Sequence, residues 1–118
     1  MLNFIQSPIF TPIILLALSN LFMTTAWYGH LKFPQLSMSY AIIFSWCIAL
    51  IEYCLAVPAN RIGYKVYSAA QLKTIQEVIT LIIFIGFSYF ILGEIPNTRT
   101  VFGFIMISAG AYLIFQPK

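Results

Sequence analysis

The chain has 118 residues, of which 61% are hydrophobic and 8% are charged, and its mean hydropathy is +0.92. Its 6 basic and 3 acidic side chains are too few to cover the surface of a soluble domain, which carries about 25% charged residues. The net charge of +3 comes from scattered lysines and arginines, so no basic patch for nucleic acid is expected. The composition therefore excludes a soluble domain and indicates a protein whose main solvent is the lipid bilayer.

Four apolar stretches are each long enough for a membrane-spanning helix, which needs about 20 residues. They are predicted at about 9–28, 38–57, 68–92 and 100–115. Continuous apolar character over such lengths excludes β-barrel strands, which would alternate apolar and polar residues. The predicted fold class is all-α, a polytopic membrane protein with four transmembrane helices that form a single domain over residues 1–118.

Prolines and glycines separate these spans in chain order. Pro12 lies at the start of the first span, where a missing N–H costs little, and residues 29–34 end that span. Pro58 is predicted to stop the second span, so that residues 58–67 form a connector. Gly93 is predicted as a left-handed cap after the third span, and Asn97 or Thr98 as the cap of the fourth.

The basic residues of the connectors give a weak orientation signal. The side of the membrane that holds both chain ends carries Arg61, Lys65 and Lys118, and the opposite side carries Lys32 and Arg99. The positive-inside rule thus favours cytoplasmic ends by a small margin, and insertion in both orientations stays open.

Three charged residues fall inside the predicted spans, where such residues are functional by default. Glu52 is predicted roughly 8 Å from the end of the second span, Glu77 roughly 14 Å inside the third, and Lys73 roughly 8 Å inside it. Lys73 and Glu77 are four residues apart and can pair on one helical face. Both predicted carboxylates and the ammonium approach from the same side of the membrane.

Further polar residues extend these faces. The third span carries a polar stripe over residues 73–80 that includes Gln76, and the first span carries Asn20, Thr24 and Trp27 on one face. Lipid cannot satisfy polar groups, so the stripes are expected to face one another. The predicted proton-binding or substrate-binding residues are Glu77, Glu52, Lys73, Asn20, Thr24, Trp27 and Gln76. The alternative is a neutralised structural network without a transport role.

No pattern of catalytic or cofactor-binding residues accompanies these polar groups. Cys47 and Cys54 lie about 10.5 Å apart along one helix, too far for a disulfide, and no ligand cluster surrounds them. The sequence contains no glycine-rich phosphate loop or nucleophile motif. We therefore expect neither an enzyme nor a bound metal or cofactor.

The last span carries small residues on one face. Gly103, Ile107, Gly110 and Ala111 lie on that face, and small residues let two helix backbones approach closely in lipid. We expect this face to be a homodimer interface, and packing within one chain is the alternative. Two copies would supply the walls that four helices lack around a ligand cavity.

Several sequence strings resemble a known superfamily. ILGE at residues 91–94 followed by GFIMISAG at 103–110 looks like the closing segment of the drug/metabolite transporter superfamily. TTAWYGHLK at 24–32, EYCLAVPANR at 52–61 and AQLKTIQE at 70–77 are similar to a short bacterial four-helix family of that superfamily without an assigned substrate. Length and span number are similar to the small multidrug resistance branch.

This resemblance implies a bacterial inner-membrane transporter of a small polar or cationic solute that works as a homodimer by alternating access. The multidrug branch binds protons and drugs with a first-span glutamate, and Asn20 stands at the matching position here. An asparagine cannot bind and release a proton, so proton coupling at that position does not carry over. Either Glu77 or Glu52 binds the proton instead, or transport is not coupled to protons. The alternative function is an accessory membrane subunit that has no transport activity of its own.

Overall fold

A computed structural model describes residues 9–115 as a series of helices, without a β-strand in that range. The order is α2 (Thr11–Tyr28), η1 (Gly29–Lys32), α3 (Met38–Gly63), α4 (Ala69–Phe87), η2 (Ser88–Leu92), α5 (Thr98–Tyr112) and η3 (Leu113–Phe115). The predicted all-α class with four spanning helices is confirmed. Lys118, which contributes to the orientation signal, lies outside the described residues.

Polar side chains cap the N-termini of α3, α4 and α5, and the predicted cap Asn97 is the one at the start of α5. Ser37 Oγ accepts from Tyr40 N–H at the start of α3, and Asn97 Oδ1 accepts from Thr100 N–H at the start of α5. Ser68 and Gln71 form a reciprocal capping box at the start of α4. Gly93 adopts φ 74°, the predicted left-handed conformation, and ends η2.

Helix α3 corrects the predicted second span. Pro58 lies inside the helix, which continues to Gly63, so the connector shortens to residues 64–68. A proline removes one backbone hydrogen bond, and spanning helices tolerate it where close packing holds the helix and a neighbouring group or water can satisfy the freed carbonyl. Such packing follows Pro58 directly, because Ala59 is fully buried and Gly63 is buried as well.

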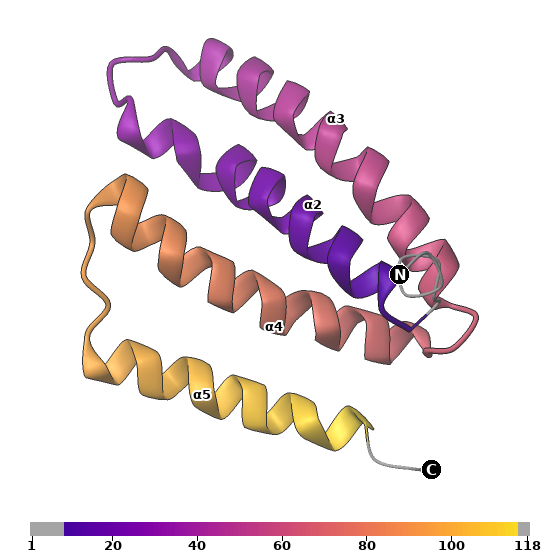
Figure 1. The fold of residues 1–118 in the computed structure, drawn as a ribbon. Helices are drawn as coiled ribbons and strands as arrows, with labels where there is room; N and C mark the ends of the chain where they lie inside the picture. The colour runs from indigo at the N-terminus through magenta and orange to yellow at the C-terminus, as the bar shows by residue number, and fades with distance from the viewer. Residues whose placement is uncertain (1–8, 116–118) are drawn as a thin grey trace.

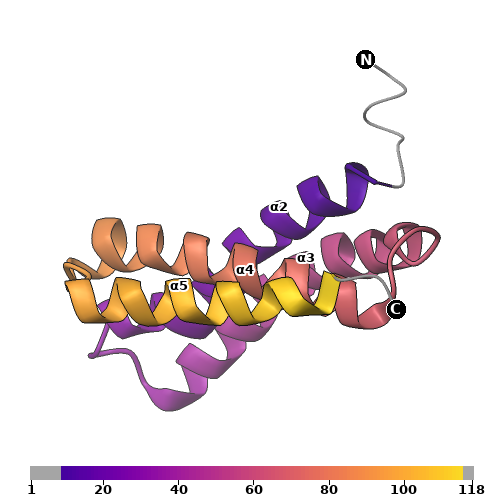
Figure 2. The ribbon, with the colours of Figure 1, turned by 90° about the horizontal axis from the view of Figure 1, so that it is seen from below.

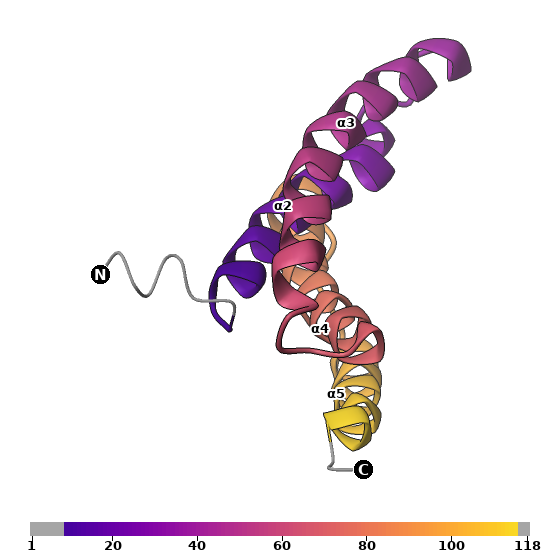
Figure 3. The same ribbon diagram turned by 90° about the vertical axis from the view of Figure 1, so that its right-hand side faces the viewer.

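The four long helices lie side by side in a single layer, in the order α3, α2, α4, α5 (Figure 1). Viewed from its right-hand side, the layer runs as one row from α3 to α5 (Figure 3), and a view from below shows α2 tilted against α4 and α5 (Figure 2). The radius of gyration is 15.9 Å, above the roughly 13.5 Å expected for a compact domain of this length. The layer is therefore open on both faces.

Helix α2 forms the small core of this layer. Its residues Leu16, Ser19 and Asn20 are fully buried between α3 and α4. At one end, Gly63 brings α3 against both other helices: a Cβ there would lie 2.6 Å from Leu72 Cδ2 and 3.1 Å from Pro12 Cβ. Three helices thus converge at a glycine, where any larger residue would have to displace the Leu72 side chain.

The remaining surface is apolar. Large aliphatic and aromatic side chains of all four long helices are exposed, and Phe90, Phe102 and Ile82 are each more than 60% exposed. The segments Thr11–Lys32, Met38–Gly63, Ala69–Leu92 and Thr98–Phe115 are each long and apolar enough to cross a membrane. The chain is therefore a multi-pass membrane protein whose outer side chains contact lipid or another protein.

Candidate functional site

A part-buried polar contact joins α2 and α4 near the middle of the segments Thr11–Lys32 and Ala69–Leu92. Thr80 Oγ1 donates a hydrogen bond to Asn20 Oδ1, and Asn20 Nδ2 donates to Leu16 O at 2.7 Å. Thr24, one turn further along α2, is only 2% exposed. The predicted facing of the first-span and third-span stripes is thus realised through Asn20 and Thr80. The amide has both of its polar atoms satisfied, as burial in an apolar medium requires.

The charged part of the α4 stripe lies outside this contact. Lys73 Nζ and Glu77 Oε1 are 2.8 Å apart, and the two side chains are 69% and 49% exposed. The predicted pairing of these two residues is present. The pair lies on the surface of a single chain, although Glu77 is only about 5 Å from the middle of the Ala69–Leu92 segment along the helix axis.

Glu52 has a different environment. It is half-buried on α3, and no ion pair or hydrogen bond involves its carboxylate within residues 9–115. Because α3 continues to Gly63, Glu52 lies roughly 16 Å from the end of its helix, close to the middle of Met38–Gly63 and deeper than predicted. Helix α2 lies between α3 and α4 over most of the layer, and α3 approaches α4 at the Gly63 end, eleven residues beyond Glu52, so Glu52 and the Lys73–Glu77 pair lie on opposite sides of α2 (Figure 1).

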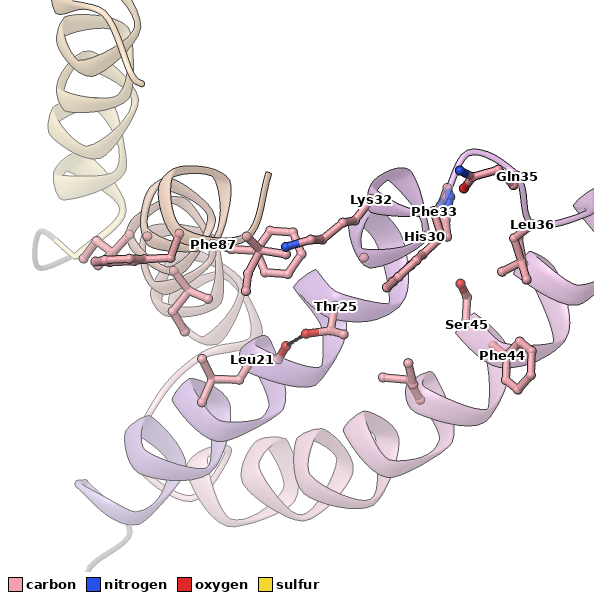
Figure 4. A pocket seen from close by; sticks show the side chains of 18 residues that line it. Leu21, Thr25, His30, Lys32, Phe33, Gln35, Leu36, Phe44, Ser45 and Phe87 are labelled. Atoms are coloured by element: carbon pink, nitrogen blue, oxygen red, sulfur yellow. Dashed lines mark hydrogen bonds between the residues drawn. The ribbon is translucent and has the colours of Figure 1, made fainter. Parts of the chain in front are cut away.

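A large hollow is a groove over the second half of α2, with a volume of about 1250 Å³ (Figure 4). Leu21 and Thr25 of α2 line its floor. Helix α3 contributes one wall through Ala41, Phe44, Ser45 and Ile48. Helix α4 and η2 contribute the other through Ile82, Ile83, Gly86, Phe87, Phe90 and Ile91. The lining is almost entirely apolar.

A second groove, of about 550 Å³, lies between α2 and α3. Trp27 of α2 and Trp46 of α3 both line it, together with Ala26, Ser45 and Ala49. Both indole side chains are 67% exposed. The predicted contact residue Trp27 therefore does line a hollow, and Trp46 joins it from the neighbouring helix.

A third hollow, of about 420 Å³, lies between α4 and α5. Glu94 and Ser88 line it, and Ser88 Oγ donates a hydrogen bond to Glu94 Oε2 at 3.2 Å. This carboxylate lies in the connector that follows η2, outside the spanning helices.

The structure separates the predicted site residues into three groups. Asn20 and Thr24 are buried in the helix layer, Trp27 lines the second groove, and the three charged residues line none of these three hollows. Gln76 is half-buried on α4 beside the ion pair. A single chain therefore does not bring Glu52 and Glu77 to one hollow.

The basic residues that line the grooves, His30 and Lys32, were not among those predicted for the site. His30 lines both large grooves and Lys32 lines the first, although their position at the end of a span indicates only a membrane-interface location. The signal that identifies them is structural, because η1 extends the helical path past Tyr28 and carries both side chains over the groove (Figure 4).

No group of three or more histidine, cysteine, aspartate or glutamate side chains that could hold a metal ion occurs within the described range. Cys47 and Cys54 are free thiols exposed on α3.

The small-residue face of α5 is open. A Cβ built on Gly103 or Gly110 would meet no atom within 4 Å, and Ile107 is 54% exposed. The described part of the chain therefore does not use these glycines for its own close packing.

These features define a class, the polytopic membrane proteins built from four apolar helices. Residues 12–115 match the family described as "Putative member of DMT superfamily (DUF486)", and the chain belongs to this family. The membership of the drug/metabolite transporter superfamily that the sequence strings predict is thereby confirmed. No curated protein and no solved structure matches the chain.

Proposed function

We propose that the protein is a small secondary transporter of the bacterial inner membrane that works as a homodimer by alternating access. Its cargo is a small polar or cationic solute. The superfamily membership supports the transporter class. The mechanism resembles that of the small multidrug resistance branch, with a different set of charged residues.

One observation carries this proposal: a charged pair of a membrane-spanning helix lies on the surface of the single chain. Lys73 and Glu77 are 69% and 49% exposed on α4. Charged side chains in the hydrocarbon region face a protein partner or a water-filled cavity, because lipid does not solvate them. A second copy that covers this surface would enclose the pair in a polar passage between two layers.

The open face of α5 supports association of two copies. A Cβ on Gly103 or Gly110 would meet no neighbour within the described residues 9–115, and small residues let helices approach closely in lipid. A dimer would contain eight spanning helices, enough to enclose a cavity that the single layer leaves open on both faces.

The charged residues take separate roles in this proposal. Glu77 binds a proton or the cationic cargo, and Lys73 competes for the carboxylate by pairing with it at 2.8 Å. Glu52, without a partner in the described chain, is the second cation-binding group. Trp27 faces cargo from the second groove, whereas Asn20 and Thr24 contact cargo only when α2 and α4 separate.

The test is cation-driven proton movement in proteoliposomes. Purified protein is reconstituted with a trapped pH-sensitive dye, and guanidinium or tetramethylammonium is added outside as the probe cation. We expect a change of internal pH with the wild-type chain and none with Glu77→Gln. The matched control is Glu94→Gln, because Glu94 lies in the connector that follows η2; this variant is expected to keep the wild-type signal.

Equal signals from the wild-type chain and Glu77→Gln would remove Glu77 from the mechanism. Absence of any flux, combined with a stable complex with a different membrane protein on purification, would favour the accessory-subunit alternative. Fusing a reporter to the C-terminus tests the proposed cytoplasmic location of the chain ends.

A further inference from the structure

The groove over α2 is about as long as one lipid acyl chain. It begins at Leu21 and Ile82, which lie near the middle of the segments Thr11–Lys32 and Ala69–Leu92. It ends at Lys32, roughly 16 Å further along the helical path from Leu21 at 1.5 Å per residue. Half of a hydrocarbon core of about 30 Å is about 15 Å. The groove therefore runs the depth of one leaflet.

The charge at the groove is confined to one end. The basic residues that line the groove are Lys32 and His30, and no carboxylate lines it. Lys32 therefore supplies the positive charge. Figure 4 shows the Lys32 side chain extending from η1 toward α4. An apolar channel from the mid-plane to a cation at the headgroup level complements an anion that has a long hydrocarbon tail.

We propose that this groove binds one anionic phospholipid of the bilayer. One acyl chain lies between α3 and α4 over Thr25 and Gly86, and the phosphate contacts the Lys32 ammonium at the end of η1. Gly86 leaves room for the chain, since a Cβ there would meet no atom within 4 Å. The volume of the groove, about 1250 Å³, is larger than a drug-sized solute needs. This site is separate from the Lys73–Glu77 pair, so it does not rest on the proposed transport.

Native mass spectrometry of the purified full chain tests the site. The chain in detergent micelles is titrated with phosphatidylglycerol or with phosphatidylcholine of the same acyl chains. We expect phosphatidylglycerol to be retained more strongly, and Lys32→Gln to lower its retention about fivefold, toward that of phosphatidylcholine. Lys32→Arg keeps the charge and should keep the preference.

Two further variants separate this site from other causes. Lys65→Gln removes an exposed charge from the connector at the other end of the layer and lines none of the three hollows, so it should leave retention unchanged. Gly86→Leu fills the groove and should lower retention of both lipids, with helical content by circular dichroism as the folding control. Equal losses from Lys32→Gln and Lys65→Gln would overturn the proposal. So would Gly86→Leu retaining lipid normally while changing the dimer fraction, which would mean that a second copy occupies the groove.

Discussion

Helices α2 and α5 belong to the same layer and are both apolar enough to span a membrane, yet their surroundings are opposite. In the most apolar 18-residue window of each segment, 33% of the residues are buried for α2 and 0% for α5. Helix α2 lies between α3 and α4, whereas α5 is at the edge of the layer (Figure 1). The chain thus stabilises its own fold through α2 and leaves α5 for contacts outside itself.

A matched pair of glycine substitutions tests this contrast most strongly. Gly63→Leu places side-chain atoms where a Cβ alone would be 2.6 Å from Leu72 Cδ2 and 3.1 Å from Pro12 Cβ. We expect it to lower the free energy of unfolding by about 1–3 kcal/mol or more. At dilutions where the chain is monomeric, Gly110→Leu, whose Cβ would meet no described atom within 4 Å, should leave that free energy unchanged. Reversible unfolding in mixed micelles, followed by circular dichroism, measures both; similar losses would show that α2 is not the core.

Helix α5, in contrast, should control the association of two copies. Gly110→Leu is expected to weaken dimer formation in micelles about tenfold, because a bulky side chain keeps two α5 helices from close approach. The measurement is the monomer–dimer equilibrium by analytical ultracentrifugation or energy transfer between labelled chains. Gly86→Leu, on α4, is the control on another open glycine. An unchanged dimer constant in Gly110→Leu would assign the interface to a different helix.

The junction between η2 and α5 gives a smaller effect. Gly93 has φ 74°, and a Cβ there meets nothing within 4 Å, so its replacement costs backbone energy alone. Gly93→Ala should destabilise the fold by about 1 kcal/mol. Gly93→Asn should lose less, because asparagine tolerates this conformation better. Unfolding free energies that are equal for alanine, asparagine and glycine would contradict the left-handed conformation.

The polar contact of the core gives the smallest predicted effect. Asn20→Leu and Thr80→Val each remove the hydrogen bond between α2 and α4, and a double-mutant cycle should give a coupling energy of about 0.6 kcal/mol. Ser108 on α5 donates only to Phe104 O of its own helix, at 3.0 Å. Ser108→Ala should therefore show no coupling to Asn20. A zero coupling for Asn20 and Thr80 would contradict the contact.

The sequence predicts the helices better than their arrangement. Span number and the caps at Gly93 and Asn97 follow from local chemistry, so the pattern is enough. The prediction that Pro58 ends the second span is wrong, because the helix continues to Gly63. The effect of this proline depends on the packing of Ala59 and Gly63, residues whose neighbours come from elsewhere in the chain. Tertiary context decided that boundary.

The candidate site was predictable where partners lie close in sequence. Lys73 and Glu77 are one turn apart, and their pairing follows from helical spacing. The general rule that polar stripes face one another predicts that the first and third spans contact each other through polar groups. It does not predict that Asn20 and Thr80 are the two residues that pair. The position of Glu52 across the layer from Glu77 depends on the order α3, α2, α4, which spacing along the chain does not determine.

The proposed transport requires that the Lys73–Glu77 pair meets water or a second copy inside the membrane. A spin label at position 77, introduced by E77C in a chain with Cys47→Ser and Cys54→Ser, measures this directly in proteoliposomes. We expect a water-soluble relaxation agent to reach the label, or labels of two copies to interact, while a label at Phe102 on α5 responds only to oxygen dissolved in lipid. A label at 77 that responds to oxygen alone, with no interaction between copies, would contradict it.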